Sequence, residues 1–507
     1  MSKTEGSGEI TKKTGSFFLA LTPIIILVAL LGLNVYFFGD NATGGPNQIA
    51  LILATAFTVI IGFTLKYSWE EMQAGIVKSI RTALPAVLIL LIIGALSGTW
   101  MLSGIVPTMI YYGLEIMSPT FFLVATCIVC AIISIATGSS WTTAATVGVA
   151  LIGIGNTMGI PAGMSAGAVI SGAYFGDKMS PLSDTTNLAP AMAGTDLFTH
   201  IKYMAYTTIP SFAITLIIFL FIGFSLDTQS NAAEIDGMLA ILSETYTISP
   251  LLFLVPALVI FLIIKKVDAV PALLVGTIAG AIAAIIAQPD IIQTIGGLKD
   301  EPQTAITYIQ QSYIASVQAM SSDVAIVTES DKINELIATG GMNGMLGTIW
   351  LIVCAMCFGG AMEITGLLSK ITNSIVKLAK STGSLIATTA STCIFFNATA
   401  SDQYLAIVVP GRMYADTFRD RGLKPEVLSR TLEDSGTVTS VLIPWNTCGA
   451  FQSNMLGVAT GDYFFYCFFN LLSPIMTVIY GYFNIKIRKY TEEETAELKA
   501  ADLYTND

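Results

Sequence analysis

The stretch that decides the fold places a proline and many polar groups inside an apolar segment. It reads Gly172-Ala173-Tyr174-Phe175-Gly176-Asp177-Lys178-Met179-Ser180-Pro181-Leu182-Ser183-Asp184-Thr185-Thr186-Asn187. A regular helix cannot continue through Met179-Ser180-Pro181, because proline removes a backbone hydrogen-bond donor and clashes with the preceding turn. Hydroxyl, amide and carboxylate groups follow the break at once. The sequence therefore predicts a broken helix with polar groups gathered around the break.

The composition around this stretch indicates an integral membrane protein. Of 507 residues, 53% are hydrophobic and 12% are charged, whereas soluble domains carry about 25% charged residues. This number of charged residues cannot cover the surface of a soluble protein. Lipid must therefore cover the remaining apolar surface. The net charge of -11 lies largely in polar stretches near residues 227–244, 300–335 and 492–507. We interpret these as solvated ends and loops, and the charge does not indicate nucleic-acid binding.

Two C-x-x-C spacings raise the alternative of a metal or redox site. They are Cys127/Cys130 and Cys354/Cys357, and the chain has one histidine, His200. Metal sites with this spacing need further ligands, and both pairs lie in apolar helical runs. We therefore expect small core residues, no cofactor and no enzymatic activity. The polar residues 1–16 and the absence of an A-x-A site after the first apolar run predict that no signal peptide is cleaved.

Apolar runs and basic residues predict the topology. Runs long enough to span occur near residues 17–38, 47–65, 83–103, 203–225, 249–264, 268–288, 345–361 and 462–485. Basic clusters between them are expected to be cytoplasmic; they comprise Lys12, Lys13, Lys66, Lys78, Arg81, Lys265, Lys266, Lys370, Lys377, Lys380, Arg412, Arg419, Arg421, Lys424, Arg430, Lys486, Arg488 and Lys489. Both termini are then on the cytoplasmic side of the cell membrane. The loops on the outer side are 39–46, 104–118, 156–163, 226–248 and 289–342.

Two further segments predict hairpins that enter the membrane and return to the same side. Residues 119–155 start and end beside uncharged outer loops, and residues 383–411 start and end beside cytoplasmic clusters. Both have polar middles, where non-helical backbone must be buried in protein or line a wet cavity. The tips are therefore candidate substrate-binding positions: Thr137, Gly138, Ser139, Ser140, Asn397, Thr399 and Ser401.

The two halves repeat at an offset of about 262 residues. Residues 96–104 align with 358–366, residues 136–139 with 398–401, and, one residue later, 180–183 with 443–446. The 83–103 run passes outward and the 345–361 run inward, so the repeats are inverted. Interrupted segments at matching positions of inverted repeats are typical of secondary transporters with a site near the membrane midplane.

We therefore expect an all-α polytopic membrane protein, with about ten transmembrane helices plus two re-entrant hairpins. The expected organisation is a tail with two helices (1–82), a first repeat (83–225), linking helices and outer loops (226–342), a second repeat (343–490) and a polar tail (491–507). The partners expected are membrane lipid, Na+, H+ and a second copy in a homodimer.

The broken segments predict a sodium site. Sodium is a hard cation that prefers several oxygen ligands, and a carboxylate that binds sodium or a proton, but not both, would couple the two. Asp184 lies in the densest polar cluster and is the first choice. The predicted ion-binding set is Asp184, Asp177, Ser180, Ser183, Thr185, Thr186, Asn187, Asp402, Asn446 and Thr447.

Several acidic residues have an alternative structural interpretation. Asp177 next to Lys178 can form a buried ion pair that holds the segment. Glu433 and Asp434, at the cytoplasmic end of the second broken segment, can be solvated helix-end charges. Glu363 can be functional or a helix-end charge.

The motif Gly176–Asn187, with Ile443-Pro444-Trp445-Asn446 in the second half, resembles the signature of the NhaC family of sodium/proton antiporters. The resemblance covers nearly the whole chain. It implies inverted repeats, paired re-entrant hairpins and elevator-like movement of a transport domain. It also implies roles for Asp177, Ser180, Ser183, Asp184, Thr185 and Asn446. The family includes relatives that exchange malate for lactate.

The leading prediction is sodium/proton antiport by alternating access. The main alternative is a sodium- and proton-coupled exchanger of small organic acids or amino acids, whose anionic substrate could be held by half-helix N-termini. An intramembrane aspartyl protease using Asp177 and Asp402 would need a G-x-G-D motif, which the sequence lacks. A channel would need a continuous pore, which inverted hairpins do not favour.

Overall fold

The computed structural model describes residues 15–38, 42, 44–226, 232–297, 307–323, 326, 328, 334, 337–376 and 379–495. Within these residues the chain is helical, without a β-strand and with one isolated bridge between Leu423 and Lys489. The predicted all-α fold class is confirmed. Lys12, Lys13, Lys377 and most of the polar C-terminal tail lie outside the described residues.

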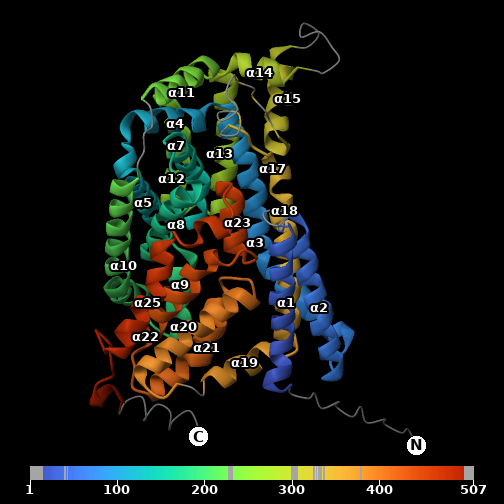
Figure 1. Cartoon of the computed structure of the whole chain (residues 1–507), viewed down its shortest axis with the longest axis vertical. Helices are drawn as coiled ribbons and strands as arrows, with labels where there is room; N and C mark the ends of the chain where they lie inside the picture. Colours follow the sequence, from blue (N-terminus) through green and yellow to red (C-terminus); the bar gives the residue numbers. More distant parts are fainter. Residues whose placement is uncertain are drawn as a thin grey trace, which may run out of the picture.

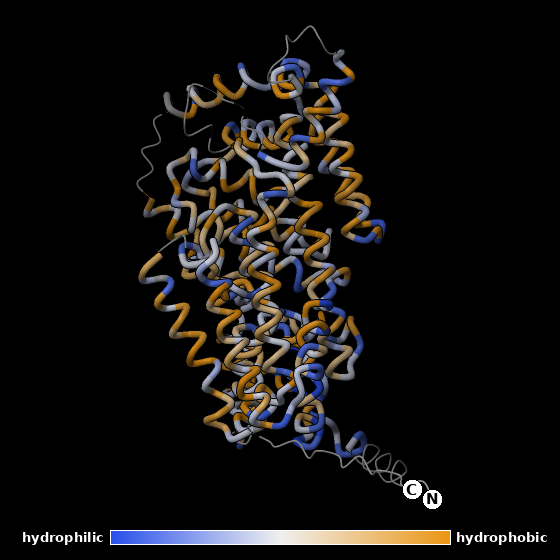
Figure 2. Tube along the Cα trace, turned by 90° about the vertical axis from the view of Figure 1, so that its right-hand side faces the viewer, coloured by the Kyte–Doolittle hydropathy of each residue, from blue (hydrophilic) through white to orange (hydrophobic). Residues whose placement is uncertain are grey.

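Seven helices of the described part are long and apolar enough to cross a membrane. They are α1 (Phe17–Phe38), α2 (Pro46–Thr64), α3 (Trp69–Leu102), α5 (Pro119–Thr137), α10 (Leu197–Ser225), α13 (Ala269–Ala287) and the α17–α18 unit (Gly341–Ile364). A bent pair, α11 (Ala232–Thr245) and α12 (Leu254–Ile264), would add an eighth. Hydrophobic residues dominate the middle of the molecule, and hydrophilic residues gather toward its ends, as Figure 2 shows.

Helix α3 begins well before the apolar run that predicted it. Ser68 caps its N-terminus in a capping box: the Glu71 amide donates to Ser68 Oγ over 3.2 Å, and the Ser68 amide donates to Glu71 Oε2 over 3.0 Å. Such a box satisfies backbone donors that the first turn of a helix leaves open. Hydropathy alone cannot place this helix start, because the first turns are polar.

The segments predicted to lie outside contain helices as well as loops. They include α4 (Ile105–Ile116), α11, α14 (Pro289–Ile295) and α15 (Tyr308–Ser321), and Figure 1 shows α11, α14 and α15 at one end of the molecule. Helix α15 packs on α3 through small residues three and four apart, and a Cβ at Gly98 would lie 1.8 Å from the Ala319 carbonyl oxygen. Because α15 is polar, hydropathy did not reveal the face through which its small side chains pack.

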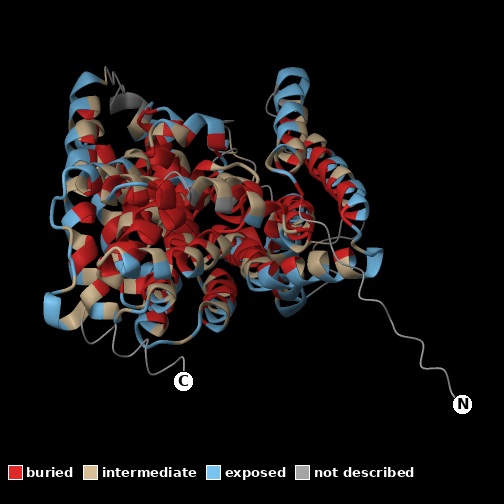
Figure 3. Ribbon diagram, turned by 90° about the horizontal axis from the view of Figure 1, so that it is seen from below, coloured by how far each residue is buried: buried red, intermediate tan, exposed pale blue. Residues whose placement is uncertain are grey.

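Two groups of helices pack side by side. In the first group, α3 contacts α13, α15 and α18 (Leu346–Ile364), and α1 and α2 complete that side. In the second group, α5 packs along α8 (Ala162–Met179) and α10, and α20 (Thr382–Thr399) packs along α25 (Phe468–Tyr482). Buried residues concentrate in the middle of the second group (Figure 3). The broken segments and hairpins lie in that group.

Both predicted hairpins are helix–turn–helix units, and their turns lie within one residue of each other in the repeat alignment. The first joins α5 to α6 (Ser140–Thr143), η2 (Ala144–Gly148) and α7 (Val149–Thr157); the second joins α20 to α21 (Leu405–Asp420). Their turns use left-handed backbone at Gly138 (φ 69°) and Ser401 (φ 59°). In the repeat alignment Gly138 matches Ala400, so the two left-handed residues lie one position apart.

The two broken segments also correspond. Helix α8 ends at Met179 and α9 (Asp184–Ala193) follows, with Ser183 as its N-cap. In the second half, α22 (Pro425–Leu432) continues into a π-helical turn, η5 (Glu433–Thr437), then into η6 (Ser440–Leu442) and α23 (Thr447–Leu456). Asn446 is the N-cap of α23. Both predicted breaks are confirmed, and the N-caps Ser183 and Asn446 are equivalent in the repeat.

Candidate ion-binding site

The hairpin tips and the first broken segment line one cavity of about 740 Å³. Its walls are residues 137–142 of the first tip, residues 402–404 of the second tip, Asp177, residues 181–185 and Thr447. On the other side lie α3, at residues 82–89, and the α12–α13 turn, at residues 263–269. The cavity therefore separates the two helix groups, and the polar tips face it.

Asp177 is one of two buried carboxylates at this cavity, and Asp402 is the other. The Asp177 side chain is 7% exposed, and its Oδ2 accepts hydrogen bonds from the Ser140 amide (3.1 Å) and the Ser140 hydroxyl (2.7 Å). Hydrogen bonds to a carboxylate are stronger than neutral ones. They join the first hairpin tip to the end of α8. The alternative of an ion pair with Lys178 is wrong, because the Lys178 ammonium pairs with Asp434.

The hydroxyls around the break satisfy backbone carbonyls that the interrupted helix leaves open. Thr186 Oγ1 donates to the carbonyls of Asp177 (3.2 Å) and Lys178 (3.1 Å), and Ser180 Oγ donates to that of Ile135 (2.8 Å). Buried carbonyls without such partners would destabilise the break. Ser180 and Thr186 therefore hold the shape of the segment, and their remaining lone pairs can still accept or coordinate.

The start of α9 supplies two more hydroxyls to the cavity wall. Ser183 Oγ accepts from the Thr186 amide over 3.4 Å and lies 3.2 Å from Thr185 Oγ1. Asn187 is exposed, and its amide donates to the carbonyls of Pro181 (3.0 Å) and Ser183 (2.7 Å). Ser183 and Thr185 thus face the cavity, whereas Asn187 braces the turn.

Asp184 lies at the edge of the cavity and not in its densest oxygen cluster. Its side chain is exposed, and Tyr404 Oη donates to its Oδ2 over a long 3.4 Å. The sequence ranked Asp184 ahead of Asp177 because more polar residues adjoin it along the chain. In the fold Asp177 is the more buried of the two, since the first hairpin tip brings Ser140 to it.

The second hairpin is fixed mainly by amide side chains. Asn446 Nδ2 donates to the Asn397 carbonyl (3.0 Å) and side-chain oxygen (3.2 Å), and Asn397 Nδ2 donates to the Gly436 carbonyl (2.7 Å). The Thr447 amide donates to the Ser401 carbonyl over 3.0 Å. These contacts join the hairpin tip to the broken segment in the second half, as Ser140 and Asp177 do in the first half.

The remaining tip residues divide into paired and unpaired groups. Asp402 is 3% exposed and accepts from the Leu405 amide (2.9 Å), Ser139 Oγ accepts from the Thr142 amide (3.1 Å), and Thr399 Oγ1 donates to the Phe395 carbonyl (2.7 Å). Thr137 Oγ1 and Ser401 Oγ are buried and have no hydrogen-bond partner among the described residues. Of these two hydroxyl-bearing residues, Thr137 lines the cavity.

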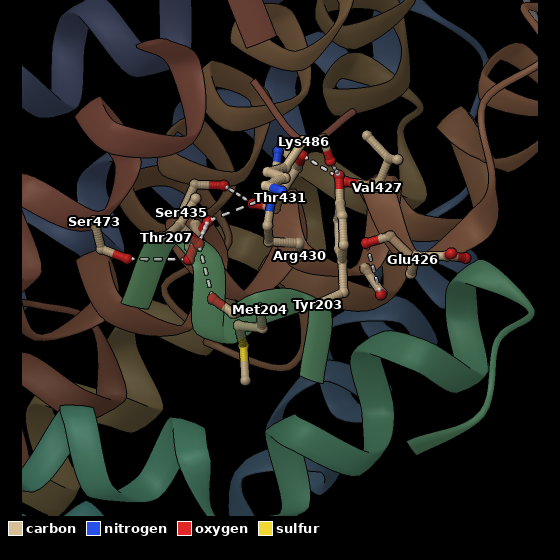
Figure 4. A network of polar contacts seen from close by, with 12 residues as sticks. Tyr203, Met204, Thr207, Glu426, Val427, Arg430, Thr431, Ser435, Ser473 and Lys486 are labelled. Carbon is tan, nitrogen blue, oxygen red and sulfur yellow. Dashed lines mark hydrogen bonds and ion pairs between the residues drawn. The ribbon is translucent and has the colours of Figure 1, made fainter. Parts of the chain in front are cut away.

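A buried charge cluster lies behind the second broken segment, and the sequence analysis missed it. Lys178 Nζ pairs with Asp434 Oδ1 and donates to Ser473 Oγ (3.0 Å), and Thr207 Oγ1 donates to Asp434 Oδ2 (2.8 Å). Figure 4 shows Thr207 of α10 and Ser473 of α25 approaching this region. The interpretation of Glu433 and Asp434 as solvated charges is wrong, because both are fully buried.

Arg430 belongs to the same cluster and not to the cytoplasmic surface. It is fully buried; its guanidinium lies 4.6 Å from the Tyr203 ring centre, and its Nε lies 4.0 Å from Asp434 Oδ2. Stacking on a ring stabilises a desolvated cation. One sequence signal pointed to the cluster: a lysine in an apolar helix requires a carboxylate partner.

Glu363 lies away from the cavity. Its carboxylate is 42% exposed and 3.7 Å from Lys78 Nζ. Of the two interpretations, the structure supports the helix-end charge.

The comparisons with known proteins agree with this architecture. A family model described as the Na+/H+ antiporter family matches residues 172–485, which include both broken segments. The Na(+)/H(+) antiporter NhaC of Alkalihalophilus pseudofirmus is 38% identical over 94% of this chain and 97% of its own. A malate-2H(+)/Na(+)-lactate antiporter of Bacillus subtilis is 35% identical (89% and 92%), and the arginine/ornithine antiporter ArcD of Halobacterium salinarum is 36% identical (96% of each).

The resemblance seen in the two motifs thus extends along nearly the whole chain. The protein is a multi-pass membrane transporter and not an enzyme. With both broken segments inside the matched region, the chain belongs to the Na+/H+ antiporter family.

Proposed function

We propose that this protein exchanges Na+ for H+ at the cavity between the hairpin tips, and that Asp177 is the carboxylate that binds sodium. The observation that carries this proposal is the buried Asp177 carboxylate at the cavity wall, which accepts hydrogen bonds from the Ser140 amide and hydroxyl. The wall beside it consists of hydroxyls and freed backbone, the hard oxygen ligands that sodium prefers. No redox group or cofactor is needed for such an exchange.

The other polar residues take distinct roles in this proposal. Ser183, Thr185 and the unpaired hydroxyls of Thr137 and Ser401 complete the oxygen ligands around the ion. Asp184 and Tyr404, at the edge, guide the cation inward. The remaining predicted residues position the two segments through the hydrogen bonds described above: Ser180, Thr186, Asn187, Asp402, Asn446 and Thr447.

The cavity also supports alternating access. It lies between α3 with the α12–α13 turn on one side and the hairpin tips on the other. A second cavity of about 780 Å³ lies further along α3, at Ser97 and Met101, and faces residues 152–162 and 454–458. Sliding of the second helix group along α3 would move the site from one cavity toward the other. Lys266 lines this cavity, and by the positive-inside rule it supports the proposal that the cavity opens on the cytoplasmic side of the membrane.

A second candidate function is coupled exchange of a small organic acid or amino acid. The cavity volume of about 740 Å³ lies in the range of small-molecule sites and far exceeds the volume of a sodium ion. Two relatives are named for malate and lactate and for arginine and ornithine. This candidate differs from the first in requiring that the organic solute itself crosses.

Transport by purified protein in liposomes distinguishes the two. With sodium higher inside the vesicles than outside, sodium leaves and protons enter, so the vesicle interior should acidify. Choline is the control cation. Malate, lactate and arginine should then leave the rate unchanged. Proton movement that appears only when one of these solutes is present would contradict plain exchange and support the second candidate.

A further inference from the structure

We propose that Glu433 carries the transported proton, at a position separate from the sodium carboxylate Asp177. This inference rests on the proposed Na+/H+ exchange and assigns its two ions to different side chains. Glu433 opens the π-helical turn η5, immediately behind the second broken segment. Single π-helical turns occur frequently at functional sites.

Glu433 differs from its neighbour Asp434 although both are fully buried. Asp434 has an ammonium and two hydroxyls against its oxygens, from Lys178, Thr207 and Ser473. Neither oxygen of Glu433 has a hydrogen-bond partner among the described residues. An ionised carboxylate in that position is strongly unfavourable. The surroundings of Glu433 therefore favour its neutral, protonated form in this conformation.

The cluster also contains what is needed for Glu433 to lose that proton. Lys178 and Arg430 carry two positive charges, and Asp434 offsets one of them. An ionised Glu433 would offset the other, and Lys178 interacts electrostatically with its carboxylate. The Thr437 hydroxyl, one turn later, has no hydrogen-bond partner of its own and lies near Glu433. The cluster can thus be neutral or carry one extra proton.

The surrounding elements add few other charges. Asp177 and Lys178 lie on α8, and Arg430 and Glu426 lie on α22. Helices α20 and α25, which pack on η5, carry no acidic or basic residue. On α9 and α21 the charged groups are Asp184, Arg412, Asp416, Arg419 and Asp420; Asp184 is exposed, and Arg419 and Asp416 form an exposed pair. Asp177 and Lys178 are therefore the groups through which the charge of a cation in the cavity acts on Glu433.

Sodium and the proton are then coupled through charge and not through a shared ligand. The negative charge of Asp177 favours the proton on Glu433. Sodium bound at Asp177 offsets that charge, so the proton on Glu433 becomes less favourable and is released. Linkage makes the effect reciprocal: the proton on Glu433 weakens sodium binding at Asp177.

The test measures protons released when sodium binds to the full-length protein in weakly buffered detergent solution. Wild-type protein should release protons on addition of NaCl and not of choline chloride, and its sodium affinity should fall about tenfold per pH unit below the apparent pKa of the release. Glu433→Gln should still bind sodium, release no protons, and bind with an affinity that is independent of pH.

Glu426→Gln is the matched control. Glu426 lies on α22 and is a buried glutamate like Glu433, but its carboxylate pairs with Arg488 over 3.1 Å. This variant should release protons as the wild type does. Proton release that survives in Glu433→Gln would overturn the proposal and return the proton to Asp177, while leaving Na+/H+ exchange itself intact. Failure of wild-type protein to exchange Na+ for H+ in liposomes would instead remove the proposed function.

Two measurements keep the proposal testable if Glu433→Gln does not fold. Glu433→Asp, which retains a carboxyl group, should restore proton release. In wild-type protein, the infrared band of a protonated carboxyl group should disappear when sodium is added. Persistence of that band at saturating sodium overturns the proposal.

Discussion

The two broken segments share a design but differ in where they place their carboxylates. In the first, Asp177 lies at a cavity and is held by the Ser140 hairpin tip. In the second, Asn446 and Asn397 form the equivalent junction between tip and break, and the acidic pair Glu433 and Asp434 lies behind it, sealed from the cavity. The repeat therefore supplies two similar frames, and unequal side chains give one an open site and the other a buried charge cluster.

The difference separates two tasks that one symmetric site would have to combine. A cation must enter and leave from water, so its carboxylate lies at a cavity wall. A fixed charge that acts at a distance must be dehydrated, because screening by water weakens it. The predictions below test this division, beginning with the buried cluster.

Breaking the buried pair should have the largest effect on stability. Lys178→Met removes the nearer of the two cations beside Asp434 and leaves Arg430 Nε 4.0 Å away. Removing one partner of a buried pair costs about 3–5 kcal/mol. The double variant Lys178→Met/Asp434→Leu should recover much of this loss, because an apolar pair of similar volume is often neutral. Thermal and denaturant unfolding in detergent measure both. A double variant as unstable as the single one would contradict the pair as the cause.

Asp177 and Asp184 should differ clearly in sodium binding. Asp177→Asn removes the buried charge and should weaken sodium binding about 100-fold or more, near 3 kcal/mol. Asp184→Asn removes an exposed charge and should cost less than about 1 kcal/mol. Calorimetric titration of each variant with NaCl decides the matter. Equal losses would show that the edge and the interior of the cavity bind the ion equally.

The left-handed turn residues of the two hairpins, Gly138 and Ser401, should respond in opposite ways. A Cβ at Gly138 would lie 2.7 Å from the Leu182 carbonyl carbon in a left-handed backbone, so Gly138→Ala should destabilise the protein by about 1–2 kcal/mol. Ser401→Gly relieves left-handed strain and should not destabilise it. Unfolding curves test stability. Sodium titration of Ser401→Gly then reports separately whether the Ser401 hydroxyl is an ion ligand.

The smallest effect concerns a contact of the second half that has no counterpart in the first. Glu494, after α25, accepts a hydrogen bond from Lys424 over 2.7 Å, and this contact holds the pKa of the Glu494 carboxyl below its ordinary value. A lowered carboxyl pKa stabilises the fold above the unfolded-state value, near 4.3, and that stabilisation is lost as pH falls. The melting temperature of Glu494→Gln should therefore lie slightly below that of the wild type at neutral pH and merge with it in acid.

Hydropathy and proline positions predicted much of this fold, because membrane helices and their breaks depend on local sequence. Helix α1 begins and ends where its apolar run does, and both breaks lie at the predicted prolines. The start of α3 was missed, because its first turns are polar. Helix α15 was missed, because it packs through small residues that resemble a loop in composition.

The sequence predicted which segments line the cavity but not which of their side chains are buried. Sequence proximity favoured Asp184, whereas a contact across 37 positions, between Ser140 and Asp177, makes Asp177 the more buried of the two. The burial of Glu433 and Asp434 depends on Lys178, which is 256 positions away from Asp434. Partners so distant along the chain cannot be assigned from local pattern alone.

The close contact of α5 and α8 also bears on leakage. A Cβ at Gly172 would lie 2.1 Å from the Cys127 carbonyl oxygen, and one at Gly176 would lie 2.4 Å from that of Ala131. Backbones this close leave no room for a water file between the two helices. An exchanger conserves the energy of a gradient only if ions cannot slip past without their counter-ion. By closing the wall beside Asp177, these two glycines block leakage of water and ions between α5 and α8.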